Sequence, residues 1–209
     1  MSTLVFFALK EEAGAFRLRV AGRADLRLVV TGIGRENAAR VAVQELERAR
    51  PERVLTCGFA GGLNPHLTAE SVIFETEDER LRTRLLGAGA RPGRFYCTDS
   101  IMVTAREKAA LYGRTGADAV EMESAAIREL CRARQIPVAT VRVISDTAGE
   151  DLPVDFNELS RPDKSVDVPH LITYVLRRPR LISPLLQLQK RTRSAAERLA
   201  AVLEEITRG

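Results

Sequence analysis

The sequence predicts an α/β fold in which helices cover a mostly parallel sheet. Two observations carry this prediction. Segments of strand length alternate with helical segments between residues 3 and 148, and the strand segments are continuously apolar, as in "TLVFFAL" at 3–9. Continuously apolar strands are typical of sheets that are buried on both faces, and such an alternation is typical of parallel sheets.

Each expected element has its own residue pattern. β-Branched and aromatic residues between turn signals mark strands, and apolar residues at intervals of three and four mark helices. The expected strands are 3–9, 26–34, 51–63, 70–78, 94–103, 119–123 and 138–148, and the expected helices are 36–50, 106–116 and 124–134. We expect residues 1–152 to form one core. Residues 153–209 are expected to be a linker and a helical region, broken at Pro179 and Pro184, that packs on the same domain.

Composition excludes several classes of protein. With 209 residues, 45% of them hydrophobic, the chain can bury the core of one domain. The first residues lack a signal-peptide pattern, and no apolar run reaches the length of a membrane span. Three scattered cysteines and two histidines predict reduced thiols and no metal site. We therefore expect a cytoplasmic protein without metal or cofactor.

The stretch "AVEMESAAI" at 119–127 places Glu121 and Glu123 two residues apart. Carboxylates at this spacing share a face on a strand but not on a helix. Ser124 is a favourable N-cap residue, so we expect a strand that ends near Glu123 and a helix that starts near Ser124. The carboxyl ends of strands are where α/β proteins bind ligands, whereas the alternative is a solvated pair in a surface turn.

Two glycine-rich turns follow expected strands: "TGIGREN" at 31–37 and "CGFAGGL" at 57–63. Their glycines allow a close approach to a ligand, or they only form tight turns. Asn37 breaks the dinucleotide-binding fingerprint, and the phosphate-binding loop of NTPases is absent. The two turns fit one nucleotide or nucleoside cleft, in which Phe59 and Gly61 are candidate binding residues.

Three acidic residues, Glu12, Glu123 and Asp146, each follow an expected strand. Individually, such residues can favour a helix N-terminus or cap a turn. Together they suit the cleavage of an N-glycosidic bond, in which one group protonates the leaving base, one activates water and one holds the ribose hydroxyls. Arg142 lies inside the last strand and needs a partner, because an unpaired buried charge is unfavourable.

The stretches "ALKEE", "TGIGRENAA", "CGFAGGL", "AVEMESAAI" and "VRVISDTA" together resemble the nucleoside phosphorylase superfamily, and within it the methylthioadenosine/S-adenosylhomocysteine nucleosidases. They follow the order of that family over residues 3–150. The resemblance implies a three-layer fold with a twisted, mixed sheet. It also implies a homodimer or larger homo-oligomer, and a purine nucleoside as the small-molecule partner.

The resemblance further implies residue roles. Glu12 is implied to activate the attacking water, and Asp146, oriented by Ser145, to engage N7 of the purine. Met122 is implied to pack under the ribose, and Glu123 to bind its 2′-hydroxyl. The remaining implied residues are Ile101 and Met102 at the adenine, and Glu121 and Arg142 in support.

The sequence departs from this family near its nucleophile and at the 5′ side. The N-terminal turn lacks the phosphate-binding motif of many phosphorylases, and Phe59 replaces a small hydroxyl residue. Both changes favour water as the nucleophile, while Arg35 leaves phosphorolysis open as an alternative. Residues 79–93 are shorter than the nucleosidase insertion, which predicts a 5′ side open to solvent or to a large group.

The C-terminal region is the third departure. Between Asp167 and Glu197 the chain has arginines and lysines but no acidic residue, and an apolar patch lies at 181–188. Such a stretch can pack as a dimer or core helix, or residues 177–193 can lie on an anionic membrane. The sparse aromatic residues argue against a nucleic-acid partner.

An open 5′ side with a basic, apolar tail resembles the hopanoid-associated branch, whose proposed task is the removal of adenine from adenosylhopane. The enzymatic alternative is a phosphorylase. The alternative from another class is a non-catalytic nucleotide-binding or membrane-associated protein.

Overall fold

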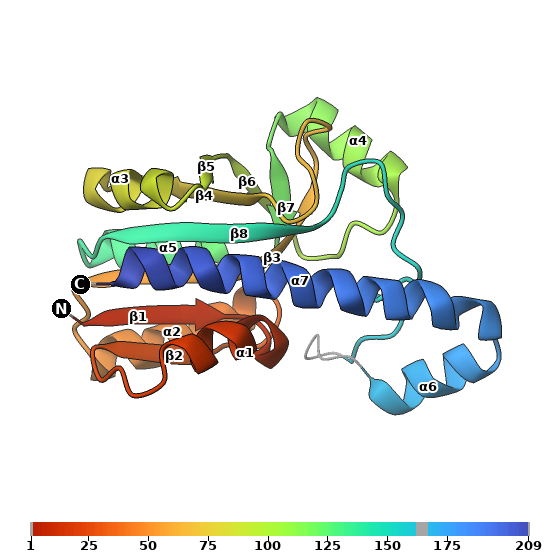
Figure 1. Cartoon of the computed structure of the whole chain (residues 1–209), viewed down its shortest axis with the longest axis horizontal. Coiled ribbons are helices and arrows are strands. Elements are labelled where there is room, and N and C mark those ends of the chain that lie inside the picture. The colour runs from red at the N-terminus through yellow and green to blue at the C-terminus, as the bar shows by residue number, and fades with distance from the viewer. Residues whose placement is uncertain (1, 162–166, 209) are drawn as a thin grey trace.

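The computed structural model describes residues 2–161 and 167–208, and part of the expected linker, 162–166, lies outside them. Helices cover both faces of a central mixed sheet in Figure 1. The main path of the sheet runs in the order β2 (Leu26–Val30), β1 (Thr3–Phe7), β3 (Arg53–Gly62), β8 (Val138–Asp146), β4 (Val72–Thr76) and β5 (Arg91–Pro92). The predicted α/β fold with a mostly parallel, mixed sheet is therefore confirmed.

The strands that position the site run in one direction. β1 pairs in parallel with β2 and β3, and β3 pairs in parallel with β8. β4 is antiparallel to β8, which makes the sheet mixed. Off the main path, β7 (Ala119–Glu121) lies antiparallel to the end of β3 and parallel to β6 (Phe95–Cys97). The carboxyl ends of four parallel strands thus meet at one edge of the sheet.

Side-chain alternation along β1 divides the core into two layers. Val5 and Phe7 face α1 and α7, whereas Leu4 and Phe6 face α2 and α5. This alternation follows from the two-residue period of a strand. Figure 1 shows α1 and α7 on the near face and α2 and α5 behind the sheet. The bounds are α1 (Lys10–Arg19), α2 (Arg35–Arg48), α5 (Ser124–Ala133) and α7 (Ile182–Thr207).

The structure adds one helix to those expected and corrects the expected break at Pro184. The segment after β4 contains a helix, α3 (Glu79–Gly87), whose N-terminus is capped by the Asp78 side chain. Pro184 does not interrupt the C-terminal helix, because it lies in the first turn of α7. A backbone N–H in the first turn has no intrahelical partner, so a proline there removes no helical hydrogen bond.

The C-terminal region forms a projecting arm. The arm consists of α6 (Val168–Leu176), the short 3₁₀ helix at Pro179–Leu181 and the first half of α7. Figure 1 shows it extending beyond the sheet, while the second half of α7 packs on the core. Of the apolar patch at 181–188, Ile182 and Leu186 are exposed. Across residues 2–161 and 167–208, no helix combines the length and apolar character needed to cross a membrane.

Candidate active site

A cavity of about 860 Å³ lies at the carboxyl ends of β1, β2, β3 and β8. Ten of the residues proposed from the sequence line this cavity: Glu12, Phe59, Gly61, Ile101, Met102, Glu121, Met122, Glu123, Ser145 and Asp146. Arg142 is not on the wall but is buried within β8. The structure therefore brings side chains from the beginning, middle and later part of the chain around one space.

Glu12 enters the cavity from the first turn of α1. Its Oε2 accepts the backbone N–H groups of Ala8 and Leu9, both at 2.9 Å, and its Oε1 accepts that of Phe59 at 2.8 Å. Burial raises the pKa of the Glu12 carboxyl, although these N–H groups and Arg142 act in the opposite direction. The group is thus fixed by three backbone donors and has more affinity for a proton than an exposed glutamate.

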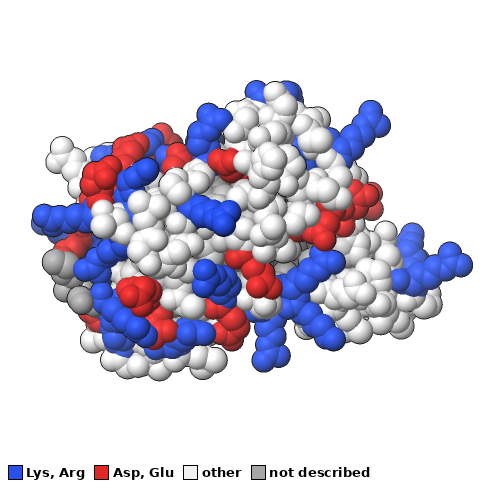
Figure 2. All heavy atoms as spheres, turned by 45° about the horizontal axis from the view of Figure 1, so that its top comes forward, with Lys and Arg blue, Asp and Glu red and all other residues white. Residues whose placement is uncertain are grey.

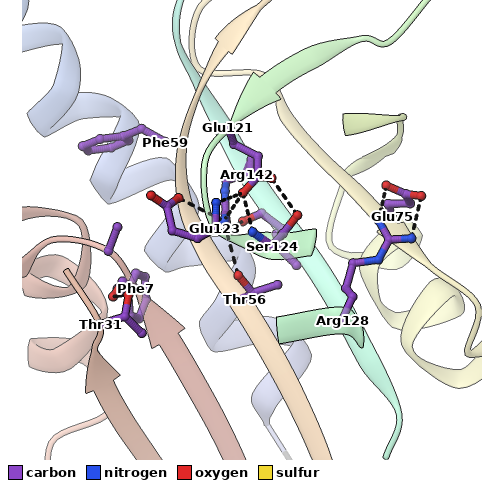
Figure 3. A network of polar contacts seen from close by, with 12 residues as sticks. Phe7, Thr31, Thr56, Phe59, Glu75, Glu121, Glu123, Ser124, Arg128 and Arg142 are labelled. Carbon is purple, nitrogen blue, oxygen red and sulfur yellow. Dashed lines mark hydrogen bonds and ion pairs between the residues drawn. The ribbon is translucent and has the colours of Figure 1, made fainter. Parts of the chain in front are cut away.

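Arg142 joins two acidic side chains beneath the cavity. Its Nη2 lies 2.8 Å from Glu121 Oε2 and 3.8 Å from Glu123 Oε2, and it also donates to Thr56 Oγ1. Figure 3 shows Arg142 between these three side chains. Arg142 is only 1% exposed, and its Nη2 has two carboxylate partners, whereas its Nε is buried without a hydrogen-bond partner among the described residues.

Glu121 caps the helix that follows it. Its Oε2 accepts the backbone N–H groups of Glu123 and Ser124, and its Oε1 accepts the Ser124 hydroxyl. The expectation that Ser124 is the N-cap is wrong, because Glu123 occupies that position and Ser124 is the first helical residue. Burial alone would raise the pKa of Glu121, but Arg142 and these donors hold it below its ordinary value.

Glu123 differs from Glu121 in its charge balance. Its Oε1 accepts the backbone N–H of Gly34, which ends the turn after β2 and is the N-cap of α2. Burial raises the pKa of Glu123 to about 7, with the repulsion of Glu121 adding to the shift and Arg142 opposing it. Glu123 therefore changes its charge near neutral pH, whereas Glu121 stays ionised there.

Asp146 ends β8 and has two side-chain partners. Ser145 Oγ donates to Asp146 Oδ1 at 2.6 Å, and Lys108 Nζ lies 2.5 Å from Asp146 Oδ2. Lys108 belongs to α4 (Ala105–Thr115) and was not singled out from the sequence. Its position on the face of Leu111, three residues away on an amphipathic helix, is the signal that places a lysine toward the core.

The backbone of the expected adenine-binding segment already forms hydrogen bonds within the chain. Ile101 donates its N–H to Asn157 Oδ1 at 2.9 Å, and its carbonyl accepts the Asn157 amide at 3.0 Å. Ile101 and Met102 both line the cavity, but the backbone polar groups of Ile101 are paired within the chain. Met122 also lines the cavity and is 9% exposed.

Arg35 and residues 79–93, both discussed from the sequence, lie away from the cavity wall. Arg35 is not among the residues of the cavity wall; it is half-exposed and faces Glu129 at 3.7 Å, whereas Arg40 lines the wall. Residues 79–93 do not line the cavity, because α3 packs against β4 and α7. The expected opening at the 5′ side stays a prediction.

The apolar end of the cavity is the part that sequence reasoning missed. Its wall includes Leu152 and Phe156 from the segment after β8, Val168 from α6, and Leu188 from α7. The arm therefore contributes directly to the wall. The described residues contain no group of three or more histidine, cysteine, aspartate or glutamate side chains placed to hold a metal ion.

Comparisons with known proteins agree with this geometry. The model of the phosphorylase superfamily matches residues 75–177. A 5′-methylthioadenosine/S-adenosylhomocysteine nucleosidase of Anoxybacillus flavithermus is 26% identical over 76% of this chain and 90% of its own. The solved nucleosidase of Helicobacter pylori has a TM-score of 0.74 at 15% identity, covering 99% of this chain and 97% of its own. The solved futalosine hydrolase of the same organism has a TM-score of 0.72 at 15% sequence identity, and the match covers 99% of this chain and 97% of that one.

The comparisons support an enzyme that cleaves N-glycosidic bonds, and over residues 75–177 the chain resembles the phosphorylase superfamily. Within that superfamily it resembles the methylthioadenosine/S-adenosylhomocysteine nucleosidases.

Proposed function

We propose that the chain is a purine nucleosidase that hydrolyses the N-glycosidic bond of a 5′-substituted adenosine. The observation that carries the proposal is the meeting of Glu12, Glu123 and Asp146 in one cavity, each held by specific partners. Such a bond breaks with a positive charge developing on the ribose and a negative charge on the base. Carboxyl groups can stabilise the first and supply a proton to the second.

Each carboxyl group has a role that its surroundings support. Asp146, oriented by Ser145, donates a proton to N7 of the departing adenine. Glu123 accepts hydrogen bonds from the ribose hydroxyls, and Met122 packs beneath the ring. Glu12 takes a proton from the attacking water, for which its raised pKa suits it.

Water rather than phosphate is supported by the surroundings of Glu12. The backbone N–H groups of Ala8, Leu9 and Phe59, which could have held an anion, already bind the Glu12 carboxylate. A phosphate there would meet a like charge. Arg40 on the wall is the observation that favours the alternative, phosphorolysis. Product analysis in phosphate buffer separates the two, because hydrolysis gives the free sugar and phosphorolysis gives the sugar 1-phosphate.

The 5′ substituent is proposed to be large and apolar, as in a lipid-linked adenosine such as adenosylhopane. Leu152, Phe156, Val168 and Leu188 form an apolar part of the same wall that carries the three carboxyl groups. A polar 5′ group would lose its hydration there without gaining partners, whereas an apolar chain is stabilised by burial.

Peripheral contact with an anionic membrane is proposed for the arm. Figure 2 shows the arm as a mostly white lobe edged with cations. The exposed apolar side chains fall in two helical stripes: Val168, Ile172 and Leu176 on α6, and Ile182 and Leu186 on α7. The cations of this region are Arg177, Arg178, Arg180, Lys190, Arg191 and Arg193. Apolar stripes with flanking cations fit the interface of an anionic bilayer.

A second copy of the chain is the other candidate occupant of the arm. Two arms that met face to face would bring two sets of like charges together, and the arm has no acidic residue between Asp167 and Glu197 to neutralise them. The predicted homo-oligomer stays a prediction, which sedimentation measures directly.

Adenine release is the experiment that tests the proposed function. The purified chain is incubated with adenosines that carry methylthio, longer alkylthio and other apolar 5′ groups, with and without phosphate. We expect release of adenine, and a loss of about 10²–10⁴-fold in kcat for Asp146→Asn. Absence of release from every adenosine, with adenine and nucleosides still binding, would instead support the non-catalytic alternative.

A further inference from the structure

Lys108 is a fully buried cation at the edge of the cavity. Its side chain has no exposed surface, although lysine is among the residues least often buried. The three N–H bonds of its ammonium group have three acceptors: Asp146 Oδ2 at 2.5 Å, the Thr147 carbonyl at 3.0 Å and the Glu150 carbonyl at 2.8 Å. Asp146 is the only carboxyl group among these three acceptors.

The attachment of α4 to its surroundings does not depend on this lysine. Thr104 and Glu107 form a capping box at the start of α4. The Ala105 N–H donates to Asp151 Oδ1, and the Leu152 N–H donates to the Val103 carbonyl. These bonds already join the helix to the segment after β8. A purely structural side chain at position 108 could therefore be apolar, and a buried cation there is expensive unless its charge is used.

We propose that Lys108 is the positioning residue of Asp146: it fixes the carboxyl group at the cavity and stabilises the charge left when Asp146 gives its proton to the departing base. This inference rests on the proposed function. It adds to the site a cation that acts through Asp146 without touching the substrate.

The protons and electrons of the reaction balance with Asp146, Glu12 and water. As the C1′–N9 bond breaks, its electron pair goes to the purine, and the Asp146 proton moves to N7. Asp146 becomes a carboxylate opposite the Lys108 ammonium. Water bonds to C1′ and its proton goes to Glu12. Solvent then returns a proton to Asp146 and removes one from Glu12, which restores the starting state.

The acidic side chains near Lys108 and Asp146 have other hydrogen-bond or ion-pair partners. Glu150, on the segment after β8, accepts from the Thr147 N–H and pairs with Arg191 of α7. Asp151 and Glu107 accept backbone N–H groups at the start of α4. Lys108 is thus the cation that contacts Asp146 among the interactions of the described residues.

Removal of the Lys108 ammonium group should shift the alkaline limb of the pH–activity profile to higher pH and, at the same time, lower the maximal kcat. In Lys108→Met, the carboxylate that forms at Asp146 loses the cation that lies 2.5 Å from it, so activity should persist to higher pH than in the wild type. The maximal kcat should fall by about 10²-fold or more, because the negative charge that develops on Asp146 during proton transfer is no longer stabilised. A structural defect alone would lower the rate without moving the alkaline limb.

The test measures kcat and KM against pH for the wild type and for Lys108→Met, Asp146→Asn and the double variant. We expect the double variant to lose no more than Asp146→Asn alone, because Lys108 acts through Asp146. The proposal would be overturned if the loss of kcat in the double variant equalled the product of the two single losses, or if the alkaline limb of Lys108→Met did not move. Arg106→Met, which removes an exposed cation from the same helix, is the matched control.

If Lys108→Met does not fold, Lys108→Arg serves as the second test variant. Arginine keeps the positive charge, so its alkaline limb should stay near that of the wild type, and a limb shifted upward would contradict the charge role. The outcomes are separable from those of the proposed function. A wild type without adenine release overturns the function itself, whereas an active wild type matched by Lys108→Met overturns only the role of Lys108.

Discussion

Gly58 lies so close to Glu12 that a Cβ atom at position 58 would be 2.6 Å from Glu12 Oε1 and 2.9 Å from its carboxyl carbon. The φ angle of Gly58 is +151°, a conformation that side chains rarely adopt. The glycine therefore makes room for the carboxyl group that is proposed to activate water.

Gly58→Ala should displace Glu12 and remove most of the activity. The methyl group meets all three carboxyl atoms, so the three backbone hydrogen bonds of Glu12 cannot all persist. We expect kcat to fall by at least about 10²-fold. Gly14→Ala is the control, because a Cβ there meets nothing within 4 Å and lies in α1. That variant should keep activity and gain up to about 1 kcal/mol of stability.

Stability should fall as the pH rises toward neutrality because of Glu123. Its folded pKa of about 7 is above the ordinary value of 4.5, so its contribution to stability is complete below pH 4.5 and is lost as the pH rises through 7. The change is about 3 kcal/mol by linkage. Urea unfolding between pH 5 and 8 measures it, and Glu123→Gln should give a flatter curve. An equal slope in both proteins would contradict the assignment.

Arg142→Met should be among the most destabilising single changes. It leaves Glu121 and Glu123 buried without their cation, which costs about 3–5 kcal/mol. Arg128→Met is the matched control, because it removes an arginine whose partner, Glu75, is nearer to solvent. The control should cost about 1 kcal/mol or less. Denaturant unfolding measures the free energy of unfolding of both variants. Equal losses in the two would show that burial does not make the Arg142 ion pairs more important for stability than the Arg128 pair.

Lengthening the 5′ substituent should improve kcat/KM. Each CH₂ group buried against Leu152, Phe156 and Leu188 should contribute about 0.8 kcal/mol, or about fourfold. A series of 5′-alkylthioadenosines measures this trend. Leu188→Ser should flatten the series while leaving the shortest substrate nearly unaffected. A preference for the methylthio compound over all longer chains would reject a large apolar substituent.

Binding to anionic vesicles should depend on the exposed stripes of the arm. Flotation with phosphatidylserine-containing vesicles measures it at low and high salt, since salt screens the cations but not apolar burial. Ile172→Ser combined with Leu176→Ser should abolish binding at both salt concentrations. Leu18→Ser, which removes an even more exposed apolar residue on α1, is the control. Vesicle binding that the arm variant leaves unchanged would assign the contact to another surface.

The fold was predictable because its signals are local. The apolar runs of β1, β3 and β8, the glycines after β2 and those within β3 are readable within ten residues. Pro184 misled the prediction, because the penalty of a proline depends on its place in the helix and not on its presence. α3 was missed, although the buried pair Leu81 and Leu85 has helical spacing.

The site was only partly predictable, because some of its groups depend on contacts between distant segments. Glu12, Glu123 and Asp146 stand in recognisable motifs that end strands. Lys108 stands in an ordinary helix, and only the packing of α4 beside residues 146–150 gives it a partner. The pairing of Ile101 with Asn157 likewise joins segments 56 residues apart, which no local pattern indicates.

The 26 residues of α7 form one uninterrupted helix of about 39 Å, anchored in the core at one end and bare at the other. Because the helix is continuous, its projecting N-terminal half has a fixed orientation relative to the strands of the sheet. A flat partner bound to it would consequently hold the whole molecule in one orientation, and the cavity wall at Leu188 would keep a constant orientation toward that partner.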